Sequence, residues 1–385
     1  MHELIRKAFG NLEDGRLGEA EAKCRVLLSG DEGDKEDLAL AEALLGFIQH
    51  RQGDSLRGQG RLRKVVDDDE PPELSRFLMG LCHLEQGNFR EAAEALEQYL
   101  SFDPGHLQAW LALSQARKRC GDAAGHLDAL ERAAQAAPHV AKIQLVFAGA
   151  LSDVGKVPAA LSCLENYLLH HGPDAEVHVA LGMLCQSEKE NRKAEEHYRA
   201  ALAVNASDAR VLNNLSSLLQ ERGMFAEALE LLERAVEAAP DYLGARFNLG
   251  NLHLASGRHE AAEDAFRRVI GQKPDFAPAH NNLGAALLKM GRAEEAIAIL
   301  ETSVTLDSSS VDAHYNLANA LSKTGRLEDS LRPFQIAVSL SPGEERIRLG
   351  LAEALLKLGR IEDAHERIQA TLTERPASTR ALSLS

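Results

Sequence analysis

The chain has 385 residues, more than one hydrophobic core usually serves, so either several domains or a repeat array is expected. Aromatic residues make up only 4% of it, which suits closely packed helices better than a β-sandwich rich in aromatic and β-branched side chains. The formal net charge of -15, from 43 basic and 58 acidic residues, opposes binding to phosphate backbones and argues against nucleic acid as a partner.

The beginning of the chain has no features of a targeting or membrane segment. Residues 1–9 carry charges throughout, and no stretch of the sequence approaches the roughly 20 apolar residues that span a bilayer. The five cysteines are widely spaced and form no C-x-x-C pair, which favours reduced packing residues over disulfides or a metal site. These features predict a cytoplasmic protein without a membrane partner.

A glycine recurs every 34 residues along the chain, with Lys189 as the one exception in the series. Ten units therefore run in phase from about Ala39 to Ser378, and a weaker unit around Gly15 precedes them. We interpret residues 1–38 as a degenerate repeat, 39–174 as divergent repeats and 175–378 as regular repeats. The glycines of the series are Gly53, Gly87, Gly121, Gly155, Gly223, Gly257, Gly291, Gly325 and Gly359.

Other positions of the unit repeat in the same phase. The glycine is expected to end a first helix in the left-handed conformation, and a proline to end the second helix. A small residue, such as Gly250 or Gly284, predicts a close contact between paired helices, where a bulky replacement should cost about 1–3 kcal/mol. Four aspartates stand where the next helix begins, placed for N-capping or first-turn support: Asp174, Asp208, Asp241 and Asp275. The prolines are Pro104, Pro138, Pro240, Pro274, Pro342 and Pro376.

This pattern, as in residues 248–274, resembles the tetratricopeptide repeat over essentially the whole chain. Trp110 lies where that family favours tryptophan, whereas Gly58 and His126 replace the usual alanine. The resemblance implies an all-α fold, a right-handed α-solenoid of about eleven helix-turn-helix repeats. It also implies a concave groove, lined by the first helix of each pair, that commonly holds a protein or peptide ligand.

Asparagines are concentrated on the first helices of four consecutive units. A carboxamide both donates and accepts hydrogen bonds, so a row of them can hold the backbone of an extended peptide. The alternative is that they bond to neighbouring helices or loop carbonyls. The row resembles the asparagine ladder of protein O-linked N-acetylglucosamine transferases, which recruits substrate polypeptides. Its members at 34-residue spacing are Asn214, Asn248, Asn282 and Asn316, and their companions are Asn213, Asn251, Asn281 and Asn319.

Backbone contacts alone predict weak binding. Each hydrogen bond contributes about 0.5–1.5 kcal/mol, and ordering a flexible peptide costs several kcal/mol. Phe247 and Tyr315 each precede a member of the row and are expected to add side-chain contacts. The carboxylate clamp that binds chaperone C-termini needs a lysine at these preceding positions, so that specialised function is disfavoured.

A second periodic set consists of Lys289, Lys323 and Lys357, near the ends of first helices. These lysines either form a basic row that attracts acidic residues of a ligand, or are solvated side chains that favour the helix C-terminal dipole.

The sequence contains no recognisable catalytic motif, so neither an enzyme nor a cofactor is expected. His126-Leu127-Asp128 matches the H-x-D fragment of an iron facial triad, but it falls on a second helix of an ordinary repeat. His178, His280 and His314 share one position of three different repeats, which is too far apart for one metal ion.

Residues 379–385 have the form of the beginning of another first helix, so the sequence is either an unusually ended array or the repeat region of a longer protein. We hypothesise a scaffold that binds a protein or extended peptide over residues 209–344 and recruits substrates for an appended or partner enzyme. The alternative is an assembly module that forms homo-oligomers or docks through convex or terminal hydrophobic faces.

Overall fold

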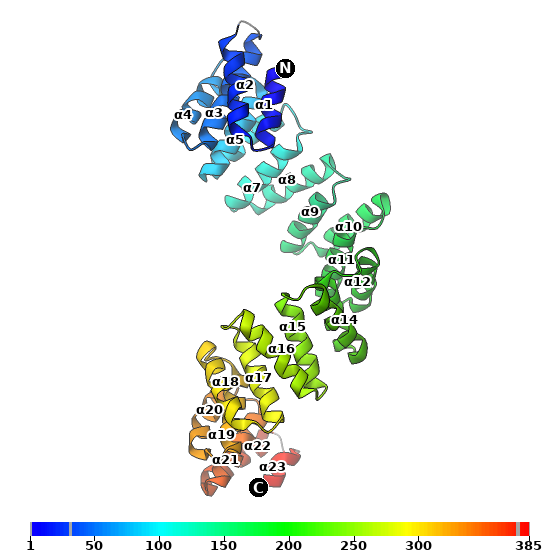
Figure 1. Ribbon diagram of the computed structural model, residues 1–385, viewed down its shortest axis with the longest axis vertical. Helices are drawn as coiled ribbons and strands as arrows, with labels where there is room; N and C mark the ends of the chain where they lie inside the picture. The colour runs from blue at the N-terminus through cyan, green and yellow to red at the C-terminus, as the bar shows by residue number, and fades with distance from the viewer. Residues whose placement is uncertain (1, 31–32, 375–377, 385) are drawn as a thin grey trace. The chain divides into compact units, whose positions relative to one another are not determined.

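The computed structural model describes residues 2–30, 33–374 and 378–384, and all regular structure in these residues is α-helical (Figure 1). The chain divides into two compact units, Met1–Glu188 and Lys189–Ser385. Eleven first helices, each followed by a second helix, confirm the predicted all-α repeat solenoid within the described residues.

In the first unit, first and second helices alternate along the chain. The first helices are α1 (Glu3–Glu13), α3 (Lys35–Arg51), α5 (Glu73–Gln86), α7 (Leu107–Arg119), α9 (Ala141–Asp153) and α11 (Ala175–Ser187). The second helices are α2 (Leu17–Ser29), α4 (Ser55–Val66), α6 (Phe89–Leu100), α8 (Ala123–Ala136) and α10 (Val157–His171).

The second unit opens with a second helix, α12 (Asn191–Val204). Its first helices are α13 (Ala209–Glu221), α15 (Leu243–Ala255), α17 (Ala277–Lys289), α19 (Val311–Lys323) and α21 (Glu345–Lys357). Its further second helices are α14 (Phe225–Ala238), α16 (His259–Gln272), α18 (Ala293–Leu306), α20 (Leu327–Leu340) and α22 (Ile361–Glu374). The predicted helix start near the end of the chain is present as α23 (Thr379–Leu384), which packs through Ala381 against α21 and α22.

The periodic glycines act as predicted at the ends of the first helices. Gly291, for example, follows α17 with a φ of 79°, in the left-handed region that a residue without a Cβ adopts at least cost. Lys189 takes the same conformation with a φ of 62°, and it is the one non-glycine residue of the described chain with a positive φ.

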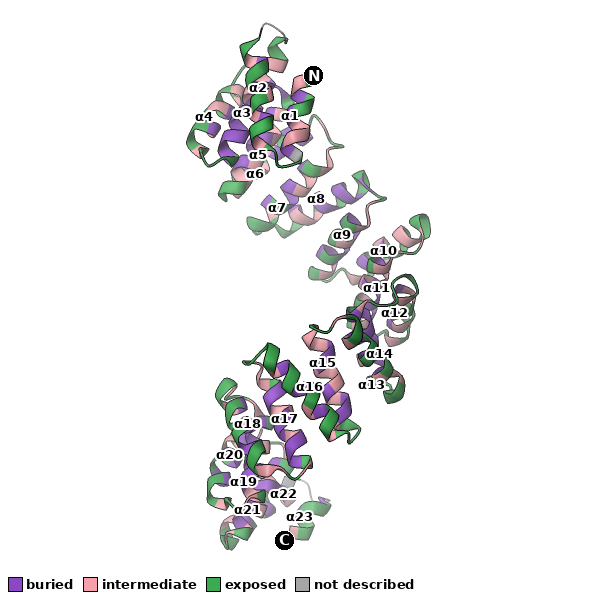
Figure 2. Cartoon of the chain, in the orientation of Figure 1, coloured by how far each residue is buried: buried purple, intermediate pink, exposed green. Residues whose placement is uncertain are grey.

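The predicted close contact between paired helices is present at Gly284. A Cβ built there would lie 2.4 Å from Cγ of Leu300 on α18, so the two helices approach too closely for a larger side chain. Buried residues concentrate where neighbouring helices face one another, while the outward sides are exposed (Figure 2).

The expectations for helix ends were correct in part. Asp174 and Asp208 cap α11 and α13, because each side chain accepts a hydrogen bond from a first-turn backbone N–H. The N-capping alternative was wrong for Asp241 and Asp275, which lie one residue before the N-cap positions of α15 and α17 and make no capping bond. Five of the prolines follow second helices as predicted, and Pro376 lies outside the described residues.

The first helices of each unit share one side of it, called here the inner face. In the second unit α13, α15, α17, α19 and α21 each contact the next first helix, whereas no comparable contacts join successive second helices in the described residues. Side chains on the exposed positions of these first helices therefore lie next to those of neighbouring repeats. Within the same residues, none of the helices combines the length and apolar character needed to cross a bilayer.

Candidate functional site

The predicted asparagines lie on the inner face of α13, α15, α17 and α19. All eight are on these four helices, and seven of them are half-buried while Asn213 is buried. The helical repeat brings them there because residues three and four apart share a helix face, and the 34-residue period repeats that face in each unit.

A hydrogen bond between two asparagine side chains bridges each neighbouring pair of these first helices. Asn248 Nδ2 donates to Asn213 Oδ1 at 2.9 Å, which joins α15 to α13. Asn282 Nδ2 donates to Asn251 Oδ1 at 2.7 Å, which joins α17 to α15. Asn316 Nδ2 donates to Asn281 Oδ1 at 2.9 Å, which joins α19 to α17.

The bridges do not follow the 34-residue spacing that defined the predicted row. The bonded residues are 35, 31 and 35 positions apart, so each bridge pairs a row member with a companion asparagine. The alternative use of these amides, in bonds between repeats, is thus present in the structure. Within one helix, Asn281 Nδ2 also donates to Asn282 Oδ1 at 2.9 Å.

Some side-chain amide donors and acceptors of the eight asparagines take no part in these bridges. Asn214 and Asn319 make no side-chain hydrogen bond with the described residues, and neither do the donor of Asn213 and the acceptor of Asn316. None of the eight side chains has a polar atom that is both buried and without a partner. The unpartnered amide atoms are therefore accessible from the inner face.

Phe247 and Tyr315 occupy the position that Asn213 and Asn281 hold in their own repeats. Phe247 packs against Phe266 and edge-on against Phe276, with ring centroids 5.8 Å and 5.2 Å away. Both aromatic side chains are half-buried, so each keeps some surface on the inner face while stabilising the contact between repeats.

Arg346, which the sequence pattern did not single out, lies over the ring of Tyr315. Its guanidinium carbon is 4.9 Å from the ring centroid, and the same side chain pairs with Asp312 on α19. The signal was available, because Asp312 and Arg346 are 34 residues apart and hold the same inner-face position in successive repeats.

The periodic lysines end α17, α19 and α21, as predicted. Lys289, Lys323 and Lys357 are exposed, and none forms an ion pair with the described residues. Each lies two turns after the central inner-face position of its helix, which Asn282 and Asn316 hold on α17 and α19. Their charges are available to a ligand and also face the negative ends of the helix dipoles.

The histidines singled out in the sequence have contacts that stabilise individual repeats. Nε2 of His280 donates to the carbonyl of Pro274 at 2.8 Å, and Nε2 of His314 donates to the carbonyl of Ser308 at 3.1 Å. Trp110 does the same with the carbonyl of Pro104 at 2.8 Å. The side chain at this shared position therefore links the first helix to the preceding loop by a hydrogen bond.

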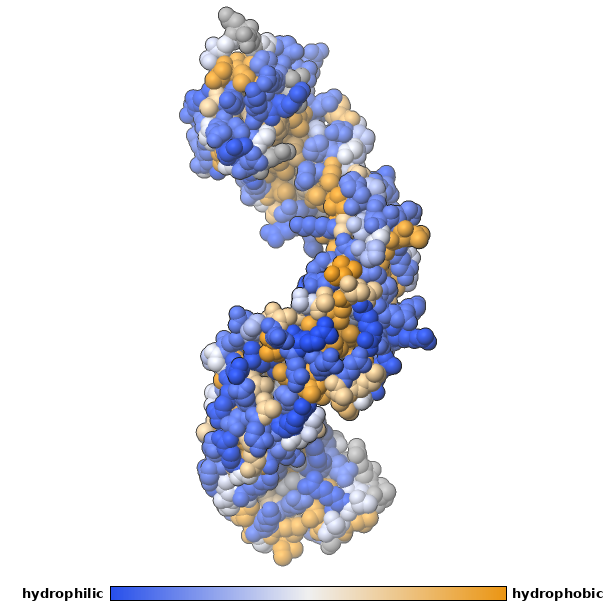
Figure 3. Space-filling view, turned by 45° about the vertical axis from the view of Figure 1, so that its right-hand side comes forward, coloured by the Kyte–Doolittle hydropathy of each residue, from blue (hydrophilic) through white to orange (hydrophobic). Residues whose placement is uncertain are grey.

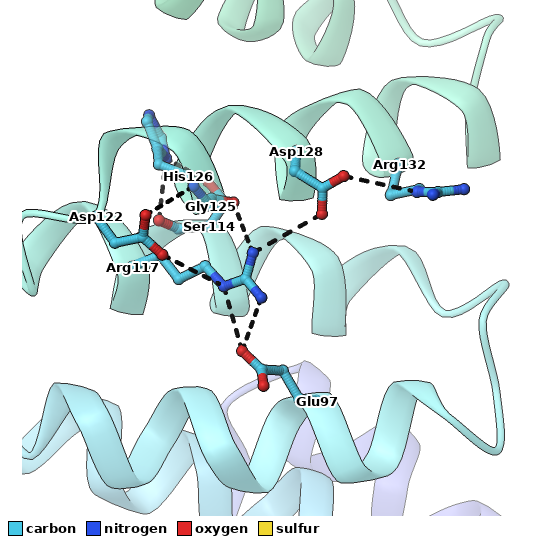
Figure 4. A network of polar contacts seen from close by, with 8 residues as sticks. All are labelled: Glu97, Ser114, Arg117, Asp122, Gly125, His126, Asp128 and Arg132. Atoms are coloured by element: carbon cyan, nitrogen blue, oxygen red, sulfur yellow. Dashed lines mark hydrogen bonds and ion pairs between the residues drawn. The ribbon is translucent and has the colours of Figure 1, made fainter.

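The H-x-D fragment belongs to a polar network between α7 and α8 (Figure 4). Nδ1 of His126 lies 3.0 Å from both the hydroxyl and the carbonyl of Ser114, and Asp128 pairs with Arg117 at 3.8 Å. Arg117 also bonds to Glu97 on α6. In the described part of the chain, no group of three or more histidine, cysteine or acidic side chains is placed to hold a metal ion.

Comparison with known proteins identifies the repeat. Three family models, each described as a tetratricopeptide repeat, match the chain. One matches residues 51–106, 77–141 and 279–345, another residues 173–241, and the third residues 218–287 and 334–385.

Curated relatives match parts of the chain. A peroxisomal targeting signal receptor of Eremothecium gossypii is 27% identical over 207 residues, which is 45% of this chain and 36% of the receptor. A probable biofilm formation methyltransferase, WspC of Pseudomonas putida, is 35% identical over 88 residues, 23% of this chain and 21% of the relative. The chain thus spans only about a third or less of the length of these two relatives.

Among solved structures, the Cut9-Hcn1 hetero-tetramer of the APC/C has a chain that superposes with a TM-score of 0.51 at 13% sequence identity. The superposition covers 99% of this chain and 88% of the other. At this identity the similarity shows a shared helical repeat fold.

Proposed function

Because the chain belongs to the tetratricopeptide repeat family, we propose that the inner face of α13, α15, α17 and α19 binds an extended peptide segment of a protein partner. The observation that carries the proposal is the set of accessible, unpartnered amide groups on a face where one asparagine bridge joins each pair of neighbouring helices. The bridges fix the bonded asparagines and join neighbouring first helices before a ligand arrives, which lowers the entropy cost of binding.

An extended peptide suits this surface because its backbone presents N–H and C=O groups that need partners. Unpartnered amide atoms of Asn214 and Asn319 supply both a donor and an acceptor at two ends of the asparagine-lined face. Phe247 and Tyr315 would add contacts to ligand side chains. Recognition that rests on the backbone predicts broad peptide selectivity with modest affinity.

The lysines at the ends of α17 and α19 extend the same proposal. Lys289 and Lys323 are exposed and unpaired, so an acidic residue of the ligand would find a partner there without breaking an existing ion pair. Their contribution would fall as salt is added, because exposed charges are screened.

The test is selection of peptides from a displayed library of random, unstructured 12-residue sequences against the immobilised full chain. The affinity of a selected peptide is then measured for the wild type and for the double variant Asn214→Ala/Asn319→Ala. Loss of two hydrogen bonds should weaken binding about 5- to 150-fold. Because these two side chains take no part in the bridges, the variant should keep its stability.

The matched control is Gln335→Ala, which removes an exposed carboxamide from the second helix α20. It should leave affinity unchanged. Equal affinity of the double variant and the wild type, or failure of the library to give any peptide that binds α13–α19, would contradict the proposal.

The proposed function also includes a cellular location. We place the scaffold in the cytoplasm, where its five cysteines would stay reduced. Its role there would be to bring peptide segments to a partner or appended enzyme domain.

A further inference from the structure

The inner face of the first unit carries apolar side chains at the positions where the second unit carries asparagines. Counting back from Asn213 in steps of 34 residues reaches Val179, Leu145, Leu111 and Phe77. Counting back from Asn251 in the same way reaches Ser217 in the second unit, and then Met183, Gly149, Gln115 and Leu81 in the first. The same face of the repeat therefore changes from amide to largely apolar between the two units.

In the first unit this face forms an apolar groove. A hollow of about 770 Å³ lies over the four first helices α1, α3, α5 and α7. Its walls include Phe9, Phe47, Phe77, Leu81 and Leu111, one or two from each helix. Apolar surface is visible among the hydrophilic residues of this unit (Figure 3). The volume lies within the range of about 300–1,000 Å³ that is common for binding pockets.

The charged groups at the edge of the groove leave one positive charge without a partner. Arg51 pairs with Glu85 at 2.8 Å and lies over the ring of Phe47. Arg6 of α1 also lines the groove, is exposed, and forms no ion pair with the described residues. An occupant with an acidic residue at this edge would complement the groove.

The chemistry of the walls favours a helical occupant. An extended segment would bury its backbone N–H and C=O groups against leucine and phenylalanine, and each unpaired group would cost about 1–3 kcal/mol. An α-helix has already satisfied its own backbone groups, so it can present apolar side chains alone. The apolar groove thus differs from the amide-lined face in the backbone conformation that it suits.

We infer that the groove over α1, α3, α5 and α7 binds the apolar face of an amphipathic α-helix of a partner protein, with an acidic residue of that helix next to Arg6. This site is separate from the asparagine-lined face and goes beyond the function proposed for it. The chain would then hold two segments of different kinds, a helix in its first unit and an extended peptide in its second.

The test uses three synthetic peptides of about 20 residues, long enough for an alanine-based helix to form in water. One has leucines at i, i+3, i+4 and i+7 with glutamates beside them, the second has lysines in place of the glutamates, and the third has prolines that keep it extended. Binding to the full chain is measured by fluorescence anisotropy. The glutamate helix should bind most tightly.

Two variants locate the site. Leu81→Asn places a polar group in the wall of the groove and should weaken binding of the glutamate helix at least about tenfold. Arg6→Glu changes an exposed side chain without an ion-pair partner, so the fold should be kept, and it should reverse the preference between the glutamate and lysine helices. The control Leu56→Asn makes the same change as Leu81→Asn at a residue of α4 that is 89% exposed.

Three results would overturn the inference. The extended peptide could bind as tightly as the helix, or Arg6→Glu could leave the peptide preference unchanged. The chain alone could also form a dimer in sedimentation experiments that Leu81→Asn disperses, which would assign the groove to a second copy. The variant Asn214→Ala/Asn319→Ala should bind the glutamate helix normally, so failure here and failure of the extended-peptide proposal are distinguishable.

Discussion

Asn316 of α19 donates its side-chain amide to the side-chain oxygen of Asn281 of α17, 2.9 Å away and one repeat earlier in the chain. The bond joins two first helices that also pack against one another. We expect a double-mutant cycle with Asn281→Ala and Asn316→Ala to give a coupling energy of about 0.5–1.5 kcal/mol in urea unfolding. Additive effects of the two substitutions would show that the bond does not stabilise the repeat contact.

Gly284 should not tolerate even one additional carbon atom. Its added Cβ would lie 2.4 Å from Leu300 Cγ, so Gly284→Ala should lower the free energy of unfolding by about 1–3 kcal/mol. Gly271, near the end of α16, has open space around it, and Gly271→Ala should be neutral or stabilise by up to about 1 kcal/mol. Similar results for both variants in chemical denaturation would contradict the proposed steric origin.

Lys189 adopts a left-handed backbone conformation that costs more free energy for a residue with a Cβ than for the glycines at the equivalent positions. Eight of the nine glycines in the 34-residue series have φ between 75° and 83° and the other, Gly53, has 101°, whereas Lys189 adopts 62° with a Cβ present. Lys189→Gly should raise the free energy of unfolding by about 1 kcal/mol. Lys189→Ala keeps the Cβ and serves as the control. If the glycine variant is no more stable than the alanine variant, the backbone conformation is not the cause.

His253 should make stability depend on pH in the weakly acidic range. Burial, together with the nearby Arg258, lowers the pKa of His253 below its ordinary value of 6.5. The unfolded chain therefore binds the proton more readily, so the stabilising contribution is complete above about pH 6.5 and is lost as the pH falls below that value.

We expect His253→Gln to flatten the pH dependence of the free energy of unfolding below about pH 6.5. The exposed His139 provides the control substitution, His139→Gln. An unchanged slope for His253→Gln, measured by urea unfolding at several pH values, would rule out His253 as its source.

Much of the fold could be predicted from the sequence because the same local sequence features recur from repeat to repeat. The glycine that ends a first helix, the proline after a second helix and the small residue at Gly284 are each determined by backbone sterics or by one close contact. The prediction of N-capping was wrong for Asp241 and Asp275, because a shift of one residue moves a side chain out of reach of the first-turn N–H groups.

The candidate site was harder to predict. The 34-residue spacing placed the asparagines on one face, but it did not indicate which amides bond to each other. The bridges join residues 31 or 35 apart, since the side chains reach diagonally between neighbouring helices. The apolar groove of the first unit was missed because leucine and phenylalanine on a helix are normally assigned to the core, and only the fold shows that Leu81 and Leu111 line a hollow.

The most direct test of the central claim concerns the peptide backbone itself. A peptide selected on the full chain is compared with a version that is N-methylated at every second residue, which removes backbone donors but keeps the side chains. If the asparagine-lined face recognises the backbone, the methylated peptide should bind the wild type at least about tenfold more weakly, with a clearly smaller loss for Asn214→Ala/Asn319→Ala. Equal affinity of the two peptides for the wild type would contradict recognition of an extended backbone by the asparagine-lined face.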